Sequence, residues 1–183
     1  MASAFRHAAA ALALGQTGIA GKSSWRLLLA GIVLSILPDA DSIGFLVGIT
    51  YKSFWGHREF SHSIVFAVFI AAIVQQLFFN SHSSKGERIR VFIFLFLGCI
   101  SHAILDAMTT GGLGVAFFSP FDDTRYFFPW RPIKVSPINV HAFFEGKGLA
   151  VLKSEAVCAA SVILLSWLVR KMKRMSVNKN SHH

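Results

Sequence analysis

Five apolar stretches, separated by short polar or proline-containing segments, constrain the fold of this chain more than any other feature. They cover residues 8–20, 25–37, 64–79, 91–105 and 149–169. A helix needs about 20 apolar residues to cross the hydrocarbon core of a bilayer. The last stretch reaches that length alone, and the third and fourth reach it with their flanking residues. The first, Ala- and Gly-rich, is a half-span or a tightly packed helix.

The composition favours a membrane protein over a soluble helical bundle. Charged residues make up 15% of the chain and hydrophobic residues 54%, whereas soluble domains carry about 25% charged residues. Polar faces at helical spacing are also missing. We therefore predict an all-α, polytopic membrane helical bundle with about 4–5 transmembrane helices. Residues 1–170 would form a single membrane-embedded domain, and 171–183 a basic cytoplasmic tail whose last two histidines resemble a tag remnant.

The net charge of +9 has an uneven distribution that predicts the orientation in the membrane. If the stretches alternate in direction, one face receives the 21–26 turn, the 80–90 loop and the C-terminal tail; we call it the basic face. It carries all of the excess charge, with Glu87 as its only acid. Lys and Arg accumulate in cytoplasmic loops, so the basic face should be cytoplasmic in a bacterial inner membrane. The basic tail is then a topology signal beside anionic lipid, and no nucleic-acid partner is expected.

A proline- and aromatic-rich segment, 109–148, joins the fourth and fifth stretches. Proline breaks regular helices, and aromatic rings favour the membrane interface. The segment is expected to form a long interfacial loop on the face opposite the basic one. It either caps a site there or only anchors the protein.

The histidines and acids at suspicious positions all fall on the face opposite the basic one. They are His7, Asp39, Asp41, His57, His62, His102, Asp106 and Glu155. His102 and Asp106 are spaced i, i+4 and so share one helix face. An imidazole nitrogen and a carboxylate on adjacent turns can bind one ion, and this donor set suits Zn²⁺ or Mn²⁺ better than Ca²⁺. A plain His–Asp hydrogen bond that stabilises packing is the alternative.

The remaining candidates differ in the role expected of them. Asp39 and His62 are expected to bind the metal, and Asp41 could orient a ligand. Asp41 or Glu155, whichever does not itself bind the metal, would accept a proton. His57 is expected at the substrate or beside the ligands, and Arg58 could hold a phosphate or carboxylate. His141 and Glu145 repeat the i, i+4 spacing and could form a second metal site.

Together these residues resemble the LexA-regulated, membrane-bound metal-dependent hydrolase family (YdjM-like). The matching pieces are His7, LPDAD at 37–41, HREFSHS at 57–63, SHAILDAMTTGG at 101–112, SPF at 119–121 and LKSE at 152–155. The resemblance implies a helical membrane protein that uses a metal for hydrolysis. It also implies a ligand set of His7, Asp39, His62, His102, Asp106 and Glu155, with His57 and Arg58 nearby.

The order Asp, His, HxxxD is also similar to the zinc-dependent phospholipase C and P1 nuclease group, which cleaves phosphoesters. By that similarity Asp39, His62, His102 and Asp106 would form the tightest site, and His7 would serve a neighbouring ion. The number of ions, from one to three, stays open. His141 and Glu145 are the only counterpart of that group's HxxxE motif.

The leading functional hypothesis is a metal-dependent hydrolase of a phosphoester, with a metal-activated water as nucleophile. A site at headgroup depth under an aromatic loop makes a lipid or lipid-linked substrate the natural choice. Two other classes stay open: a carrier for metal ions or protons, and a structural membrane protein whose metal holds the helices together. Ionisable groups at one end, rather than at several depths, favour the enzyme.

Overall fold

The structure is a computed structural model. It describes residues 4–19, 21, 24–80 and 84–135 and, in the C-terminal part, residues 153, 156–157, 160–161, 163–164, 166–172 and 175. Within these ranges the regular elements are all helical: α1 (Ala4–Gln16), α2 (Trp25–Ile36), η1 (Leu37–Val47), η2 (Phe60–His62), α3 (Ile64–Phe78) and α4 (Lys85–Ala107). The described C-terminal positions are helical as well. The predicted all-α class is therefore confirmed for the described residues.

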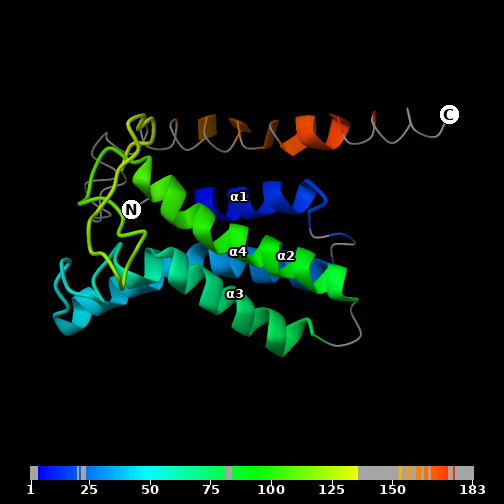
Figure 1. Ribbon diagram of the computed structural model, residues 1–183. Coiled ribbons are helices and arrows are strands. Elements are labelled where there is room, and N and C mark those ends of the chain that lie inside the picture. Colours follow the sequence, from blue (N-terminus) through cyan, green and yellow to red (C-terminus); the bar gives the residue numbers. More distant parts are fainter. Residues whose placement is uncertain are drawn as a thin grey trace.

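The four long helices run alternately in opposite directions (Figure 1). α1 leads away from the end that holds η1 and η2, α2 returns to it, α3 leaves it and α4 comes back. We call this the site end and the other the basic end. α4 contacts each of α1, α2 and α3 and so forms the centre of the bundle. The alternation brings Asp39, His62 and His102 to the same end of the molecule.

Serines fix the starts of three helices. Ser24, Ser63 and Ser84 each accept a hydrogen bond from a backbone N–H in the first turn of the helix that follows. Ser84 also forms a capping box, because Glu87 accepts a hydrogen bond from its backbone N–H. Such caps satisfy N–H groups that have no partner within the helix. They place the start of α3 directly after His62.

The second apolar stretch corrects one sequence-based expectation. The sequence LPDAD predicts that the second helix ends at Pro38 and that Asp39 and Asp41 lie at a helix-to-loop boundary, and α2 does end at Ile36. Instead of entering a loop, the chain continues from α2 into the 3₁₀ helix η1 as far as Val47. Proline occupies the first turn of η1, where its missing N–H costs nothing. Both aspartates therefore sit on an ordered helical turn.

Among the described residues, two helical segments are long and apolar enough to cross a membrane: Trp25–Val47 and Lys85–Ala107. α3 is apolar but shorter, and α1 has 13 residues, about 20 Å at 1.5 Å per residue. These lengths make a membrane helical protein plausible. The figure of four to five spans stays a prediction.

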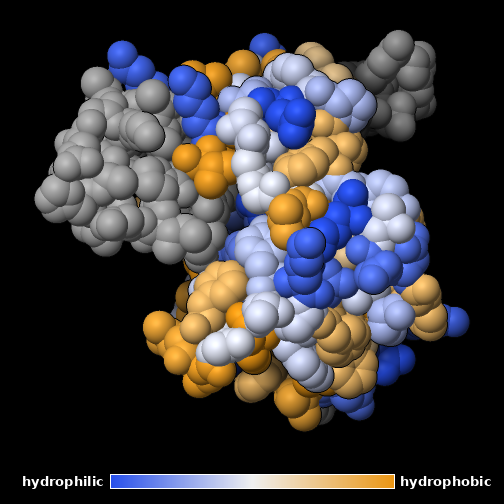
Figure 2. All heavy atoms as spheres, turned by 90° about the vertical axis from the view of Figure 1, so that its left-hand side faces the viewer, coloured by the Kyte–Doolittle hydropathy of each residue, from blue (hydrophilic) through white to orange (hydrophobic). Residues whose placement is uncertain are grey.

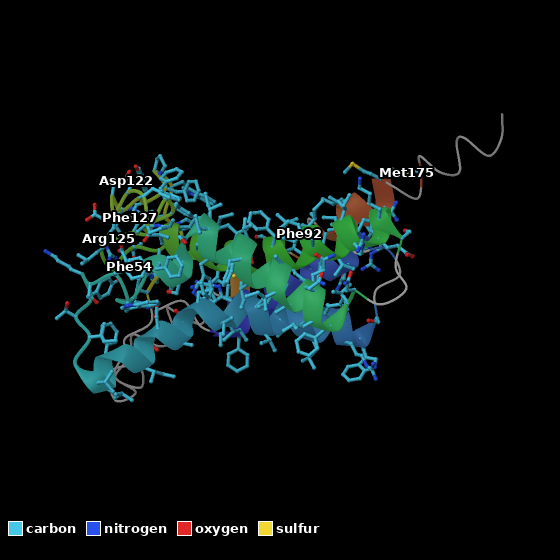
Figure 3. The ribbon with its side chains drawn as sticks, turned by 60° about the horizontal axis from the view of Figure 1, so that its bottom comes forward. Phe54, Phe92, Asp122, Arg125, Phe127 and Met175 are labelled. Carbon is cyan, nitrogen blue, oxygen red and sulfur yellow. The ribbon has the colours of Figure 1, made fainter. Side chains whose placement is uncertain are left out.

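Segment 108–135 covers the site end without forming a helix. Two isolated β-bridges, Thr109 with Ile133 and Val115 with Tyr126, fold it back on itself. Figure 3 shows Asp122, Arg125 and Phe127 at the same end as Phe54, whereas Phe92 of α4 lies farther along the bundle. Viewed from this end, hydrophilic residues occupy much of the centre and apolar ones lie around them (Figure 2). Exposed apolar side chains include Leu46, Phe121 and Trp130, as expected of a membrane interface.

Close contact between α2 and α4 depends on glycine. A Cβ at Gly31 would lie 2.6 Å from the ring of Phe94, which is fully buried. Opposite it, a Cβ at Gly98 would lie 3.2 Å from the carbonyl oxygen of Gly31. Small residues let helix backbones approach closely in membrane proteins. This contact sets how near His102 of α4 comes to the end of α2.

Gly31→Ala is expected to destabilise the protein, whereas Gly86→Ala is expected to stabilise it. Both replacements gain about 1 kcal/mol of helix propensity. Only the first forces a methyl group against Phe94, because nothing lies within 4 Å of a Cβ at Gly86. Overpacking costs about 1–3 kcal/mol, so the two unfolding free energies should differ by about that amount. Denaturant titration in detergent micelles measures the difference; equal stabilities would show that the helices are not in this contact.

Candidate metal centre

Four side chains from three elements meet at the site end. Asp39 comes from η1, His62 from η2, and His102 and Asp106 from adjacent turns of α4. The two histidines and Asp106 are buried, whereas the side chain of Asp39 keeps 13% of its surface exposed. Their donor atoms all lie within 4.8 Å of one another. The sequence-based prediction had named these four as the tightest set, and the structure brings them together.

The spacing of the donor atoms fits one tetrahedral ion. His102 Nε2 lies 3.3 Å from Asp39 Oδ1 and 3.9 Å from Asp106 Oδ2. His62 Nε2 lies 3.9 Å from Asp39 Oδ1 and 3.6 Å from Asp106 Oδ2. Two ligand bonds of about 2.0–2.1 Å at the tetrahedral angle place their donor atoms about 3.4 Å apart. Small side-chain shifts would therefore suffice to bind Zn²⁺ or Mn²⁺.

None of the four donor atoms has a hydrogen-bond partner within the described part of the chain. Asp106 Oδ2 has its ion pair with Arg58, which leaves Asp39 Oδ1, His62 Nε2 and His102 Nε2 without a comparable partner. A buried polar atom without a partner is costly and calls for an explanation. An ion at the centre of the group would satisfy all three at once. The residues present therefore fit a divalent metal.

Hydrogen bonds to the other ring nitrogens fix the orientation of both histidines. His102 Nδ1 lies 2.7 Å from the carbonyl oxygen of Ser35 in α2. A carbonyl only accepts, so this nitrogen carries the proton and Nε2 keeps its lone pair for a metal. His62 Nδ1 lies 3.2 Å from Asp41 Oδ2, which has the same consequence. Such partners of ligating histidines are characteristic of metal sites.

The charge around His62 favours a cation. Burial alone lowers the pKa of His62, but the carboxylates of Asp106 and Asp41 beside the ring outweigh burial and raise the pKa to about 9. The carboxylates thus stabilise a positive charge at this position. A divalent ion supplies such a charge in place of a proton.

Asp41 connects the loop before α3 to η1. One of its oxygens lies 2.7 Å from His57 Nδ1. The other accepts hydrogen bonds from the Ser61 hydroxyl and the backbone N–H of Arg58 and contacts His62. The predicted role of Asp41 as an orienting residue fits these contacts. They leave it less suited to accept a proton than His57.

Asp41→Asn is expected to weaken metal binding without abolishing it. The variant loses the negative charge beside His62 and the acceptor for one ring N–H, while the four donor atoms remain. Losing such an outer partner typically costs about 10–100-fold in metal affinity. Competition titration with a chromogenic zinc chelator measures the change. An unchanged affinity would show that Asp41 does not act through His62.

Arg58 is buried and engaged in contacts with the protein itself. Its Nε lies 2.9 Å from Asp106 Oδ2, and its other nitrogens donate to the carbonyl oxygen of Gly111 and the hydroxyl of Thr109. Its φ of 65° lies in the left-handed region, which non-glycine residues rarely adopt. Arg58 was expected to hold a phosphate or a carboxylate. The structure gives it the carboxylate of Asp106.

Gly112 leaves room for this arginine. Its φ is 86°, and a Cβ there would lie 2.6 Å from Arg58 Nη1 and 3.0 Å from the Tyr51 hydroxyl. A side chain at this position would be strained and would displace the guanidinium. The GG pair at 111–112 of the resemblance motif therefore has a structural reason: one carbonyl binds Arg58, and the next residue makes space for it.

A second arginine ties segment 108–135 to the loop before α3. Arg125 forms an ion pair with the buried Glu59 and donates to the carbonyl oxygens of His57 and Tyr51. Its guanidinium also lies over the ring of Tyr51, 5.2 Å from the centroid. Of the two roles left open for this segment, capping and anchoring, these contacts of its described part fit capping.

His7 lies beside the metal site. Its ring stacks on that of His102 with centroids 3.7 Å apart, and it is fully buried. Within the described residues it does not belong to the group of four donors. That His7 binds a neighbouring ion stays a prediction. Glu155, His141 and Glu145 lie outside the described residues.

Several residues of the site were not singled out from the sequence. They are the Ser35 carbonyl, Tyr51, Glu59, Ser61, Thr109, Gly112 and Arg125. Thr109 and Gly112 lie in the motif SHAILDAMTTGG. Because this motif extends six residues beyond Asp106, it could have indicated that residues after the ligands also belong to the site. A carbonyl acceptor such as that of Ser35 leaves no trace in residue type.

Comparison with known proteins shows the family to which this chain belongs. A family model described as "YdjM inner membrane protein" matches residues 1–177. The chain is 39% identical over 156 residues to the inner membrane protein YbcI of Escherichia coli (strain K12). The aligned residues make up 85% of this chain and 88% of that protein. No solved structure matches. The YdjM-like part of the sequence resemblance is confirmed: the chain belongs to the YdjM inner membrane protein family.

Proposed function

We propose that this protein is a membrane-bound, metal-dependent hydrolase that cleaves a phosphoester in a lipid or lipid-linked substrate. The observation that carries the proposal is the convergence of Asp39, His62, His102 and Asp106, with three unpaired donor atoms, at one end of an apolar bundle. Asp39 is the partly exposed member, so a substrate would approach along it.

A divalent ion held by these residues would activate water and polarise a phosphoryl oxygen, and the partly exposed Asp39 is the ligand that this water would join or displace. The chain supplies a proton acceptor beside them. His57 donates its Nδ1–H to Asp41, which leaves Nε2 free to accept a proton. The rings of His57 and His62 are 5.3 Å apart, so this acceptor borders the ligand set. Asp41 orients both histidines, and Arg58 holds Asp106.

An apolar pocket of about 350 Å³ beside the ligands supports a lipid substrate. Its wall includes Pro38 and Ala40, which flank Asp39, and also Asp41 and Ser61. The remaining lining residues are Leu37, Gly44, Ile49, Trp55 and Phe66. A pocket that is largely apolar with a few polar groups at one end suits an amphipathic ligand. An acyl chain or prenyl tail there would place its phosphoester near Asp39.

The decisive experiment measures metal content and turnover on the same samples of purified protein. Phosphatidylglycerol and bis(p-nitrophenyl) phosphate serve as substrates. Wild type should contain metal and release product, whereas His57→Gln should keep the metal and lose most turnover. Lys52→Gln, an exposed neighbour on the same loop, is the matched control. Wild type that binds metal stoichiometrically but releases no product from either substrate would overturn the proposal.

We also infer that the basic end faces the cytoplasm and that the metal centre faces the extracytoplasmic side. At the start of α4, Lys85, Arg88 and Arg90 stand against Glu87, and Arg26 lies on the first turn of α2. Basic residues near span ends set orientation in the inner membrane.

A cysteine at position 123 should react with a membrane-impermeant maleimide in intact spheroplasts, whereas one at position 86 should not. Asp123 and Gly86 are both exposed. Gly86 lies at the start of α4, at the basic end, and Asp123 lies in segment 108–135, at the site end. Cys99→Ala and Cys158→Ser remove the native thiols. Both sites should react equally after lysis, which controls for accessibility. The reverse pattern in intact cells would place the metal centre in the cytoplasm.

A structural metal site is the second candidate, because four protein ligands form the closed set typical of structural zinc. In that case metal removal would unfold the protein, and no substrate would turn over. An ion carrier remains the third. Flux of zinc or protons into proteoliposomes, lost in Asp39→Asn, would favour it over both.

A further inference from the structure

A second pocket lies at the basic end, away from the metal centre. It is an apolar groove of about 480 Å³ between α2 and the end of α3. Leu29, Ala30, Val33, Leu34, Val74, Phe78 and Phe79 form its apolar wall, and Trp25 and Arg26 complete its lining. The groove is thus an apolar slot with one cation.

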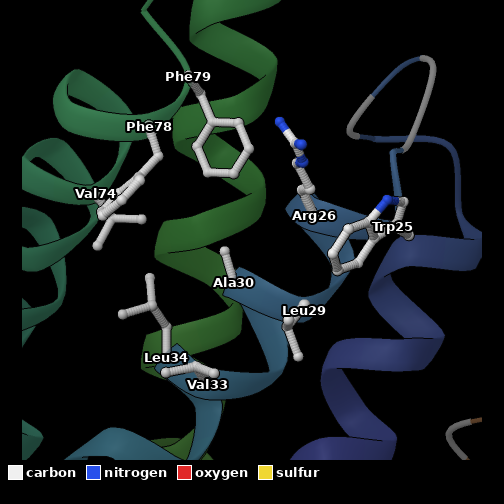
Figure 4. Close-up of a pocket in the computed structure, with 9 residues that line it drawn as sticks. All are labelled: Trp25, Arg26, Leu29, Ala30, Val33, Leu34, Val74, Phe78 and Phe79. Atoms are coloured by element: carbon white, nitrogen blue, oxygen red, sulfur yellow. The ribbon is translucent and has the colours of Figure 1, made fainter.

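Figure 4 shows how the lining is arranged. Val33, Leu34 and Val74 lie at one end of the groove. Arg26 lies at the other end, between Phe79 and Trp25. The guanidinium carbon of Arg26 is 5.9 Å from the centre of the Trp25 ring. Tryptophan and arginine at the end of an apolar surface are typical of the headgroup level of a bilayer.

The charges around the groove select the headgroup of its occupant. Arg26 opens the first turn of α2, and Lys85, Arg88 and Arg90 occupy the first turns of α4 at the same end. Glu87 is the one acid among the described residues of these turns, and its carboxylate accepts a hydrogen bond from the backbone N–H of Ser84. A neutral or zwitterionic headgroup gains little from this surface, whereas an anionic one is attracted to it.

We propose that this groove binds one acyl chain of an anionic glycerophospholipid and that Arg26 binds the phosphate of that lipid. The apolar wall accounts for the chain, and the Arg26–Trp25 pair accounts for the headgroup. About 16 Å of helix separates Trp25 from the end of α2, so the headgroup of this lipid lies well away from the substrate proposed for the metal centre. The proposal stands whether or not the protein is a hydrolase.

Quenching of Trp25 fluorescence by brominated lipid tests the proposal at the groove itself. Trp25 is exposed and lines the groove, and replacing Trp55, Trp130 and Trp167 with Phe leaves it as the single reporter. The full-length protein is reconstituted into vesicles of brominated phosphatidylcholine with an equal amount of unbrominated phosphatidylglycerol or unbrominated phosphatidylcholine. Far-UV circular dichroism checks that each variant is helical.

Unbrominated phosphatidylglycerol should relieve the quenching of Trp25. The occupancy of the groove calculated from that relief should be about fivefold higher than random mixing of the two lipids predicts, because one basic side chain near the surface favours anionic lipid by about that factor. Arg26→Gln should remove most of this preference, whereas Arg131→Gln, exposed at the site end, should keep it. Ala30→Phe should fill the groove and reduce quenching, whereas Ala72→Phe on the exposed side of α3 should not.

Equal relief by both lipids, or the same preference in Arg26→Gln, would overturn the proposal. So would a Trp25 that brominated lipid does not quench, because the groove would then be covered by protein, such as a second copy of this chain. Native mass spectrometry of the unmodified protein, released from a mixture of the same two lipids, gives an independent measurement. It should retain phosphatidylglycerol in preference to phosphatidylcholine.

Discussion

Replacing Asp106 with Asn is expected to remove nearly all bound metal from the purified protein. Asp106 supplies one of the four donors and lies close to both histidine Nε2 atoms. With neutral histidines, the two carboxylates of the ligand set balance a divalent charge. The variant halves that negative charge while keeping the side-chain shape. Outer residues alone contribute about 10–100-fold to metal affinity, so losing a direct ligand should cost at least about 100-fold.

Mass spectrometry of zinc and manganese measures this loss after dialysis against a weak chelator. Asp122→Asn is the matched control, because Asp122 is an exposed aspartate on segment 108–135. Its metal content should equal that of wild type. Near-stoichiometric metal in Asp106→Asn would contradict the four-donor centre. Circular dichroism separates loss of the site from loss of the fold, since insertion and helix content should survive the substitution.

The gathering of ionisable residues at one end could be predicted from the sequence because it depends on alternation alone. Four apolar stretches that reverse direction must bring Asp39, His62 and His102 to one face. The i, i+4 spacing of His102 and Asp106 is equally local, since helix geometry places both on one side. These inferences needed no contact between distant residues, and the structure agrees with them.

The behaviour of the chain after α2 could not be predicted in the same way. The sequence LPDAD predicts a helix stop, because proline breaks helices. In the structure α2 does end at Ile36, but Pro38 lies in the first turn of a 3₁₀ helix, and Asp41 of that helix accepts hydrogen bonds from the loop before α3. That engagement is tertiary: Asp41 and His57 are 16 positions apart. Tertiary hydrogen bonds overcame the local preference for irregular chain.

The roles of Arg58 and Arg125 depend on still longer separations. Arg58 binds Thr109 and Gly111, 51 and 53 positions away. Arg125 reaches the carbonyl oxygens of His57 and Tyr51, 68 and 74 positions away. No periodicity links such residues, and an arginine at a membrane interface is commonly solvated. The sequence could therefore mark Arg58 as suspicious without showing that it serves Asp106.

Arg58→Met is expected to cost about 3–5 kcal/mol of unfolding free energy, because it leaves the buried carboxylate of Asp106 without its ion-pair partner. Methionine keeps much of the side-chain volume, so the loss reports the charge and hydrogen bonds more than a cavity. Arginine and methionine would adopt the same left-handed φ at position 58. The backbone strain is therefore the same in wild type and variant and does not contribute to the difference in unfolding free energy. Denaturant titration in detergent micelles, with chelator present, measures the cost.

Zinc should reduce that cost, because an ion bound at the four donors neutralises Asp106 in place of the guanidinium and stabilises the folded state by mass action. Arg131→Met is the matched control: Arg131 is exposed and lies over the ring of Phe127, so its replacement should stay within about 0.5 kcal/mol. Combining Arg58→Met with Asp106→Asn should cost less than the sum of the two, since each removes the same pair. Additive losses, or a cost for Arg58→Met that zinc leaves unchanged, would show that the arginine stabilises segment 108–135 and not the metal centre.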